Sequence, residues 1–185
     1  MDLISGLGGS CWFGEKVLQR GDSTRSVVDL KSVFGTGLNF YGTTYTHLSI
    51  NNDGNVTFGK DGLDAGTPWK MSENSGVPII APFWGNVNTH SYTLNQEPNV
   101  VSPTPGGTSK GSNSVWYDID TSGFGKLTIT WDDVGYSGPY GDGLSAKKNA
   151  FQMQIIGIGG GYFDVKFIRP KRGLKPPPFR RVAFC

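Results

Sequence analysis

The segment formed by residues 43–58 constrains the fold more than any other part of the chain. A run rich in β-branched and aromatic residues ends at Ile50, the turn residues Asn51-Asn52-Asp53-Gly54-Asn55 follow, and Val56-Thr57-Phe58 resumes the apolar pattern. Asp-Gly between two alternating runs is a strong signal for a β-hairpin, because a type I′ turn needs positive φ at both central residues. The alternation predicts that four apolar side chains face one layer: Leu48, Ile50, Val56 and Phe58.

The rest of the chain repeats this pattern of short strands separated by turns. Further strands are expected at residues 114–119, 126–134, 149–158 and 162–168. Within the third of these, Phe151 and Met153 alternate with Gln152 and Gln154, the pattern of a half-buried antiparallel strand. The sequence therefore predicts an all-β domain: an antiparallel sandwich or partly open barrel of about seven to nine short strands, with little helix.

Two segments are harder to assign. Residues 23–34 contain Ser26 and Asp29 at capping-box spacing, but Val27-Val28 and the short length favour a strand, which is our prediction. The apolar run at residues 77–87 carries two prolines, which confine its pairing to a sheet edge or a bulge. Phe83 and Trp84, in the most apolar part of this run, are expected to be core anchors.

Charge and hydropathy exclude several classes of partner. The last seventeen residues hold six basic and no acidic side chains, so the remainder has 11 basic against 15 acidic residues, a net charge of −4. A mildly acidic body carries no electrostatic footprint for nucleic acid. No stretch approaches the roughly 20 apolar residues that a membrane span needs. The only two cysteines lie near opposite ends of the chain, which excludes a disulfide framework and a zinc site.

Composition divides the chain into three parts. Residues 1–14 are Gly-rich and loop-like, with neither the basic start nor the apolar run of an export signal. Residues 15–168 carry the strand pattern and form the expected domain. Residues 169–185 are basic and rich in proline, so we expect them to lie outside the fold.

Few residues suggest catalysis. Asp118 and Asp120 lie two apart on an expected strand and so share one face, and Asp132 follows on the next strand. A pair of carboxylates is what a glycoside hydrolase uses as acid and base. Solvated surface carboxylates explain the same residues, and we weigh that interpretation more heavily. No nucleophile motif accompanies either histidine.

A loop rich in Gly and Pro offers the clearest candidate for recognition. It contains Tyr136, Tyr140 and Asp142 between the second and third of the expected strands above. Exposed turn-rich loops with tyrosines are typical of protein or sugar binding, so these three residues are the predicted binding site.

Several motifs in order resemble the nidogen-like extracellular domain, and particularly its bacterial surface members. The resemblance rests on the hairpin with Asn52-Asp53-Gly54, on Ala81-Pro82-Phe83-Trp84, on Trp131-Asp132-Asp133-Val134-Gly135 and on Asn149-Ala150-Phe151-Gln152. It covers roughly residues 15–168. Each motif alone is weak, and the ordered set is much stronger. The motif residues are expected to be structural: Asn52, Asp53, Gly54, Phe83, Trp84, Trp131, Phe151 and Gln152.

The resemblance implies a non-enzymatic extracellular module for cell–matrix or cell-surface adhesion, one domain of a larger secreted protein. Its expected partner is an extracellular matrix or cell-surface protein, or a glycan. The alternatives are a carbohydrate-binding module and a glycoside hydrolase using Asp118, Asp120 and Asp132. Family members usually follow the APFW segment with an acidic pair, whereas this chain has Gly85-Asn86-Val87-Asn88. Calcium is therefore not supported, and no cofactor or metal is expected.

Overall fold

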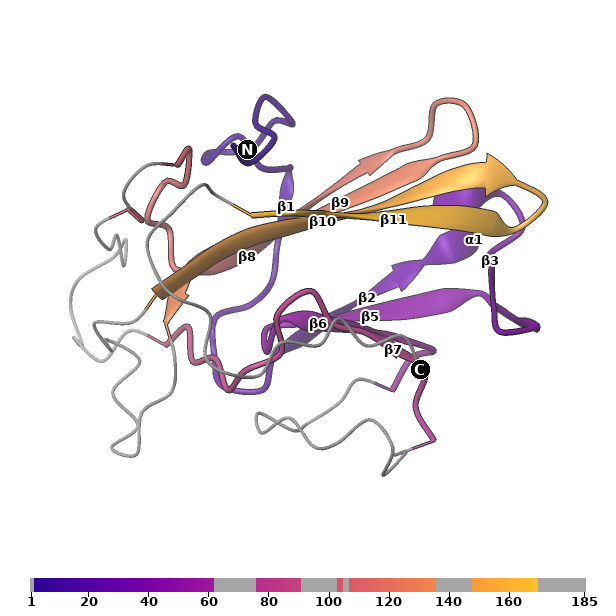
Figure 1. Ribbon diagram of the computed structural model, residues 1–185, viewed down its shortest axis with the longest axis horizontal. Coiled ribbons are helices and arrows are strands. Elements are labelled where there is room, and N and C mark those ends of the chain that lie inside the picture. The colour runs from indigo at the N-terminus through magenta and orange to yellow at the C-terminus, as the bar shows by residue number, and fades with distance from the viewer. Residues whose placement is uncertain (1, 62–75, 91–102, 105–106, 136–147, 170–185) are drawn as a thin grey trace.

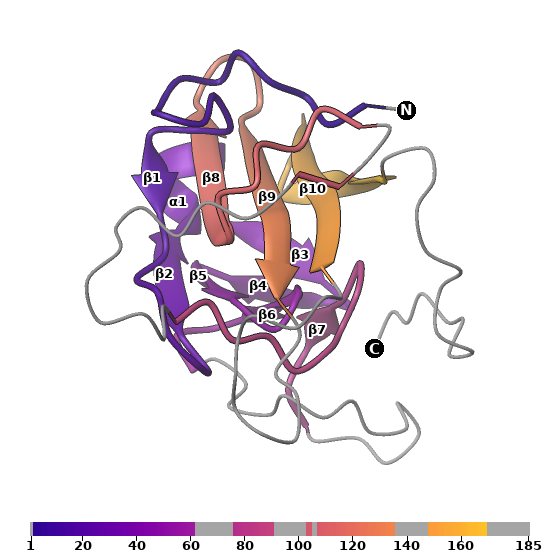
Figure 2. The same cartoon turned by 90° about the vertical axis from the view of Figure 1, so that its left-hand side faces the viewer.

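The protein forms two packed antiparallel sheets in a computed structural model that describes residues 2–61, 76–90, 103–104, 107–135 and 148–169. The first sheet has the strand order β1 (Lys16–Val17), β8 (Ser114–Asp120), β9 (Lys126–Gly135), β10 (Lys148–Gly159) and β11 (Tyr162–Ile168). The second has the order β2 (Arg25–Asp29), β5 (His47–Asn51), β6 (Asn55–Phe58) and β7 (Ile79–Ile80). Figures 1 and 2 show the two layers stacked face to face.

Two smaller elements lie near one end of this stack (Figure 1). They are the two-stranded sheet of β3 (Leu38–Phe40) with β4 (Thr43–Tyr45), and the helix α1 (Leu30–Phe34). The prediction of an all-β antiparallel sandwich with little helix is confirmed. The described residues contain eleven strands rather than seven to nine, because two strands have only two residues each and residues 43–50 divide between β4 and β5.

The core lies between the two sheets, where the period-2 pattern placed it. Leu48 pairs with Phe58 and Ile50 with Val56 across β5 and β6, and all four side chains are buried in one cluster. The first sheet adds the inward side chains of β9 and β10 to the same cluster: Leu127, Ile129, Trp131, Phe151, Met153 and Ile155. Burial of these apolar faces is the main stabilising contribution to the sandwich.

The β5–β6 turn differs from the prediction. Asn51 pairs with Asn55, so the loop has three residues, and only its last residue, Gly54, has positive φ (80°). This is the three-residue hairpin loop with glycine in the left-handed region, not a two-residue type I′ turn. The turn is also buried: Asn52 and Asp53 are at most 1% exposed. A buried turn must have its polar groups bonded by other segments, which a surface turn does not require.

Residues 23–34 contain both of the structures that we weighed. The strand β2 ends at Asp29, whose carboxylate then accepts a hydrogen bond from Lys31 N (2.9 Å) and caps α1. The strand prediction is therefore wrong for residues 30–34. Leu30 and Val33 are buried on the inner side of this one-turn helix, so packing against the core stabilises a helix that is too short to persist alone.

Phe83 and Trp84 are not the fully buried anchors that we expected, because both side chains are partly exposed. Their segment follows the short strand β7, and its backbone bonds to the β5–β6 turn: Phe83 N to Gly54 O (3.4 Å) and Gly85 N to Asp53 O (3.1 Å). The Phe83 ring still contacts Phe151 at 5.6 Å between centroids. Trp131, in contrast, is 0% exposed and stacks on Phe151 at 4.8 Å.

The N-terminal residues cover the outer face of the first sheet without forming a strand or helix between positions 2 and 14. Leu3 and Phe13 are buried against Ile168. The Gln152 side chain pairs with the backbone of Ile4, accepting from its N (2.9 Å) and donating to its O (2.9 Å). Gln152 was expected on a solvated face and is instead fully buried, because this segment covers it.

Replacing Gly54 by alanine is expected to destabilise the fold by several kcal/mol. An ideal Cβ there would lie 1.8 Å from Phe83 O, on a backbone with φ of 80°. We expect the left-handed conformation to cost about 1 kcal/mol and the clash about 1–3 kcal/mol more. Gly42→Ala is the control, because Gly42 has φ of 85° but nothing within 4 Å of an added Cβ. If urea unfolding showed the same loss of unfolding free energy in the two variants, the close approach of Phe83 O to Gly54 would be contradicted.

The two tryptophans should also differ in their contribution to stability. Trp131→Ala removes a fully buried ring and is expected to cost about 3–5 kcal/mol of unfolding free energy. Trp84→Ala should cost clearly less, because that ring is only partly buried. Denaturant unfolding followed by circular dichroism measures both, and a larger loss at Trp84 would restore the original expectation.

Candidate binding groove

Tyr41 is the most exposed large hydrophobic side chain in the described part of the chain, with 73% of its surface accessible. It lies in the β3–β4 turn with φ of 47°, a conformation that tyrosine rarely adopts. The turn is held by a hydrogen bond from Gly42 N to Asn39 Oδ1 (3.1 Å). The ring packs edge-on against Phe40, with centroids 4.7 Å apart and planes at 77°. Tyr41 is therefore held in an exposed position by its neighbours.

An aromatic cluster supports this turn from the core side. The Phe40 ring stacks on Phe58 at 4.4 Å, and Phe58 in turn contacts Tyr45 at 5.3 Å and Phe163 at 5.9 Å. The cluster joins β3, β4, β6 and β11, so it fixes the two-stranded sheet to both large sheets. Offset and tilted ring pairs at these separations contribute roughly 0.5–1.5 kcal/mol each beyond their area burial.

Tyr41 and Phe40 line two shallow grooves. The larger, about 290 Å³, lies toward the edge of the first sheet and is also lined by Asn39, Ile80, Phe163, Asp164 and Val165. The smaller, about 170 Å³, is also lined by Thr43, Tyr45, Gly76, Val77 and Pro78. We call the two together the Tyr41 groove. Rigid tyrosines beside a groove with both apolar and polar lining offer a flat apolar face and a hydroxyl, which suits the recognition of a protein or sugar surface.

The predicted binding residues Tyr136, Tyr140 and Asp142 lie outside the described residues, so that prediction stands untested. Sequence reasoning missed Tyr41. A turn was readable from Tyr41-Gly42 between two strand-like runs, but the exposure of the ring depends on how β3 and β4 pack against β6 and β11, which only the tertiary structure shows.

Most of the motif residues meet at one junction between the sheets, at the buried β5–β6 turn, whereas Gln152 lies on the outer face of the first sheet. Asn52 Nδ2 donates to Gly21 O (3.2 Å) and Val87 O (2.8 Å), and Asp53 Oδ1 accepts from Val87 N (2.8 Å). Trp131 Nε1 donates to Asn51 O (3.1 Å), which joins the first sheet to the second. These hydrogen bonds hold the turn to both neighbouring segments, so the junction stabilises the fold.

Asp132 and Asp133 are fully buried and bond to the loop residues 104 and 110–112. Asp132 accepts from Lys110 N and Ser112 N, both at 2.8 Å, and Asp133 accepts from Thr104 N (3.0 Å), Thr104 Oγ1 and Gly111 N (2.9 Å). Adjacent strand residues normally face opposite sides. A bulge here, with φ of 51° at Asp133, lets both carboxylates reach one loop. Burial raises the pKa of Asp132, and the hydrogen bonds oppose that shift.

This geometry separates Asp132 from the other candidate carboxylates. Asp132 pairs with Ser114 on β8, four residues from Asp118, which is roughly 13 Å along the strand at about 3.3 Å per residue. Paired glycosidase carboxylates lie about 5–9.5 Å apart. Asp118 and Asp120 themselves share the outer face of the first sheet, as predicted, and neither lines the Tyr41 groove.

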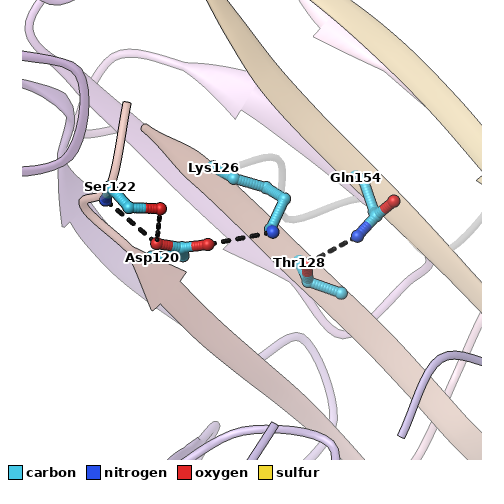
Figure 3. Close-up of polar contacts among 5 residues, drawn as sticks. All are labelled: Asp120, Ser122, Lys126, Thr128 and Gln154. Carbon is cyan, nitrogen blue, oxygen red and sulfur yellow. Dashed lines mark hydrogen bonds and ion pairs between the residues drawn. The ribbon is translucent and has the colours of Figure 1, made fainter. Parts of the chain in front are cut away.

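Asp118 and Asp120 have opposite electrostatic environments. Figure 3 shows Asp120 accepting from the Ser122 hydroxyl (2.6 Å) and backbone N (2.9 Å), with Lys126 Nζ at 2.9 Å. The Ser122 hydroxyl, followed by Lys126, lowers the pKa of Asp120 below its ordinary value. Partial burial and then the Asp120 charge raise the pKa of Asp118, while Lys126 lowers it. Asp120 is held as a carboxylate in an exposed ion pair.

In the described part of the chain, no three His, Cys, Asp or Glu side chains gather as a metal centre would require. The segment that replaces the family's acidic pair is bonded internally: Asn88 Oδ1 accepts from His90 N (2.9 Å), and Val87 is held by Asn52 and Asp53. The helix in the described residues is too short to cross a membrane.

Two packed antiparallel sheets with the motif junction between them define an all-β sandwich domain. The family model described as "Nidogen-like domain" matches residues 46–176, which is most of the chain. The chain belongs to the nidogen-like domain family.

The match begins after β1 to β4, although β1 and β2 are paired into the two large sheets. It ends beyond residue 168, where we placed the domain boundary, and residues 170–185 lie outside the described part. Neither the curated proteins nor the solved structures gave a match.

The two carboxylates on β8 are expected to titrate separately in carboxyl NMR, with Asp118 at the higher pH. Lys126→Met should raise both pKa values, because Lys126 lowers each of them. Asp120→Asn should lower the pKa of Asp118, because it removes a neighbouring negative charge. Coincident titrations in the wild type would contradict the arrangement in Figure 3.

Proposed function

We propose that the chain is a non-enzymatic extracellular interaction module that supports cell–matrix or cell-surface adhesion, and that the Tyr41 groove is its ligand-binding surface. Membership of the nidogen-like family supports an extracellular-type module. The observation that carries the site is the exposed Tyr41 ring, fixed on Phe40 beside two grooves. Tyrosines in such positions are enriched among residues that dominate binding energy.

The partner in this proposal is a protein or glycan of the extracellular matrix or cell surface. Two polar groups beside the groove could bond such a ligand. One is the Asn39 Nδ2 donor, which has no hydrogen bond among the described residues, and the other is the Tyr41 hydroxyl. A few polar groups beside aromatic rings fix orientation, while the rings supply buried area. The non-enzymatic part is supported by the distance between Asp118 and Asp132 and by the structural bonds of Asp132.

Tyr41→Ala is expected to weaken binding to the recognised ligand by about tenfold or more, since truncating a central aromatic commonly costs about 1.4 kcal/mol or more. Binding would be measured on immobilised matrix proteins, cell-surface proteins and a glycan array, which also separates the protein and glycan alternatives. Tyr41→Phe keeps the ring and tests the hydroxyl alone.

Phe124→Ala is the matched control, because Phe124 is 65% exposed and lines neither groove. Unchanged binding by Tyr41→Ala, or an equal loss in the Phe124 variant, would remove the groove from the proposal. Turnover of a glycoside by the wild type that is lost in an Asp118→Asn, Asp120→Asn variant would overturn the non-enzymatic part.

A further inference from the structure

The strand β11 forms an open edge of the first sheet. It pairs with β10, and no described strand pairs with its other side. β3 packs beside the first part of this edge, with the Phe40 ring 6.3 Å from that of Phe163, and Asn39 N donates to Gly161 O (2.7 Å) just before β11 begins. β11 has seven residues and alternates between exposed and partly buried side chains up to Phe167. An edge strand of this length is a template for another strand, unless its side chains prevent pairing.

The sequence of β11 has a two-fold pattern centred on Val165. On either side of Val165 stand Asp164 and Lys166, and beyond them Phe163 and Phe167. Suppose that two identical β11 strands pair antiparallel with Val165 facing Val165. Each residue then faces the residue of the other copy that lies equally far from Val165 in the opposite direction along the chain. Asp164 of one copy then faces Lys166 of the other, twice, and Phe163 faces Phe167, twice.

The two charges are available for such a pairing. Asp164 and Lys166 are both exposed, and neither has an ion pair within the described part of the chain. Their neighbours across β10 are Ile156 and Gln154, which are uncharged. Opposite charges directly across two strands stabilise pairing, whereas like charges destabilise it. A single type of charge would repel a second copy, but this pair attracts one.

We propose that β11 is a self-association edge, on which a second copy of this chain pairs antiparallel about Val165 and joins the two five-stranded sheets into one. The interface is isologous: each copy contributes Asp164 and Lys166 to the same pair of contacts. Phe163, Asp164 and Val165 also line the larger part of the Tyr41 groove, so a second copy paired along β11 would cover that side of the groove. The inference goes beyond the proposed function and does not depend on it.

Charge reversal tests this register. The full chain is studied alone by sedimentation equilibrium from about 10 μM to about 1 mM, because an edge contact buries little area and gives weak association. Asp164→Lys places Lys against Lys at both contacts and should weaken dimerisation by about tenfold or more. The double variant Asp164→Lys, Lys166→Asp restores both opposite-charge contacts in reverse, and should regain the wild-type dissociation constant. High salt should weaken dimerisation of the wild-type chain, because it screens the two opposite-charge contacts.

Lys16→Asp is the control, because Lys16 is exposed on β1 at the opposite edge of the same sheet. The Lys16→Asp variant should dimerise as the wild type does. In a separate measurement on the wild type, amide hydrogen exchange at residues 163–167 should slow as the protein concentration rises. A wild type that stays monomeric, with exchange independent of concentration, overturns the proposal and leaves the edge to a strand of another protein. A dimer that the double variant does not restore also overturns it, because the contact then uses another surface or register.

Discussion

The fold depends on the burial of a polar turn between two apolar sheets. The β5–β6 turn would cost several kcal/mol if its amides were left without partners. Asn52 and Asp53 bond to the backbone on either side, and Trp131 reaches across the sandwich to Asn51 O. Gly54 allows Phe83 O to approach closer than any side chain would permit. One set of contacts therefore fixes the hairpin, the segment after β7 and the first sheet relative to one another.

The parts of the fold that were predicted from sequence are those that depend on local pattern. The layer of Leu48, Ile50, Val56 and Phe58 follows from the period of two residues, and the prolines correctly limited β7 to an edge. The errors concern positions where distant segments decide the outcome. Burial of the turn was not visible from Asn-Asp-Gly, and full burial of Gln152 depends on Ile4, 148 residues away. Trp84 and Trp131 are equally apolar, and only the packing between sheets distinguishes them.

The candidate site illustrates the same limit. Tyrosine is as common in cores as on binding surfaces, so Tyr41 carries no signal by type alone. Its exposure results from a left-handed backbone in a turn whose neighbours, Phe40 and Tyr45, are held by Phe58. Asp132 was misjudged in the opposite direction: we favoured a solvated surface carboxylate, yet Asp132 is fully buried, and a bulge turns it and Asp133 toward backbone amides of one loop. In both cases the backbone conformation, not residue type, determines the role.

The edges of the two sheets differ in a way that bears on self-association. β1 and β7 have two residues each, too few to support a continuous ladder with another strand. β2 has five residues and carries Arg25 and Asp29 about Val27, a similar charge pattern, but the Asp29 carboxylate caps α1 and the chain turns away there. β11 is longer, and its charges have no such structural task. Among the described edges, β11 therefore combines length, opposite charges and symmetry, and a strand added there would extend a sheet whose core the motif junction already holds in place.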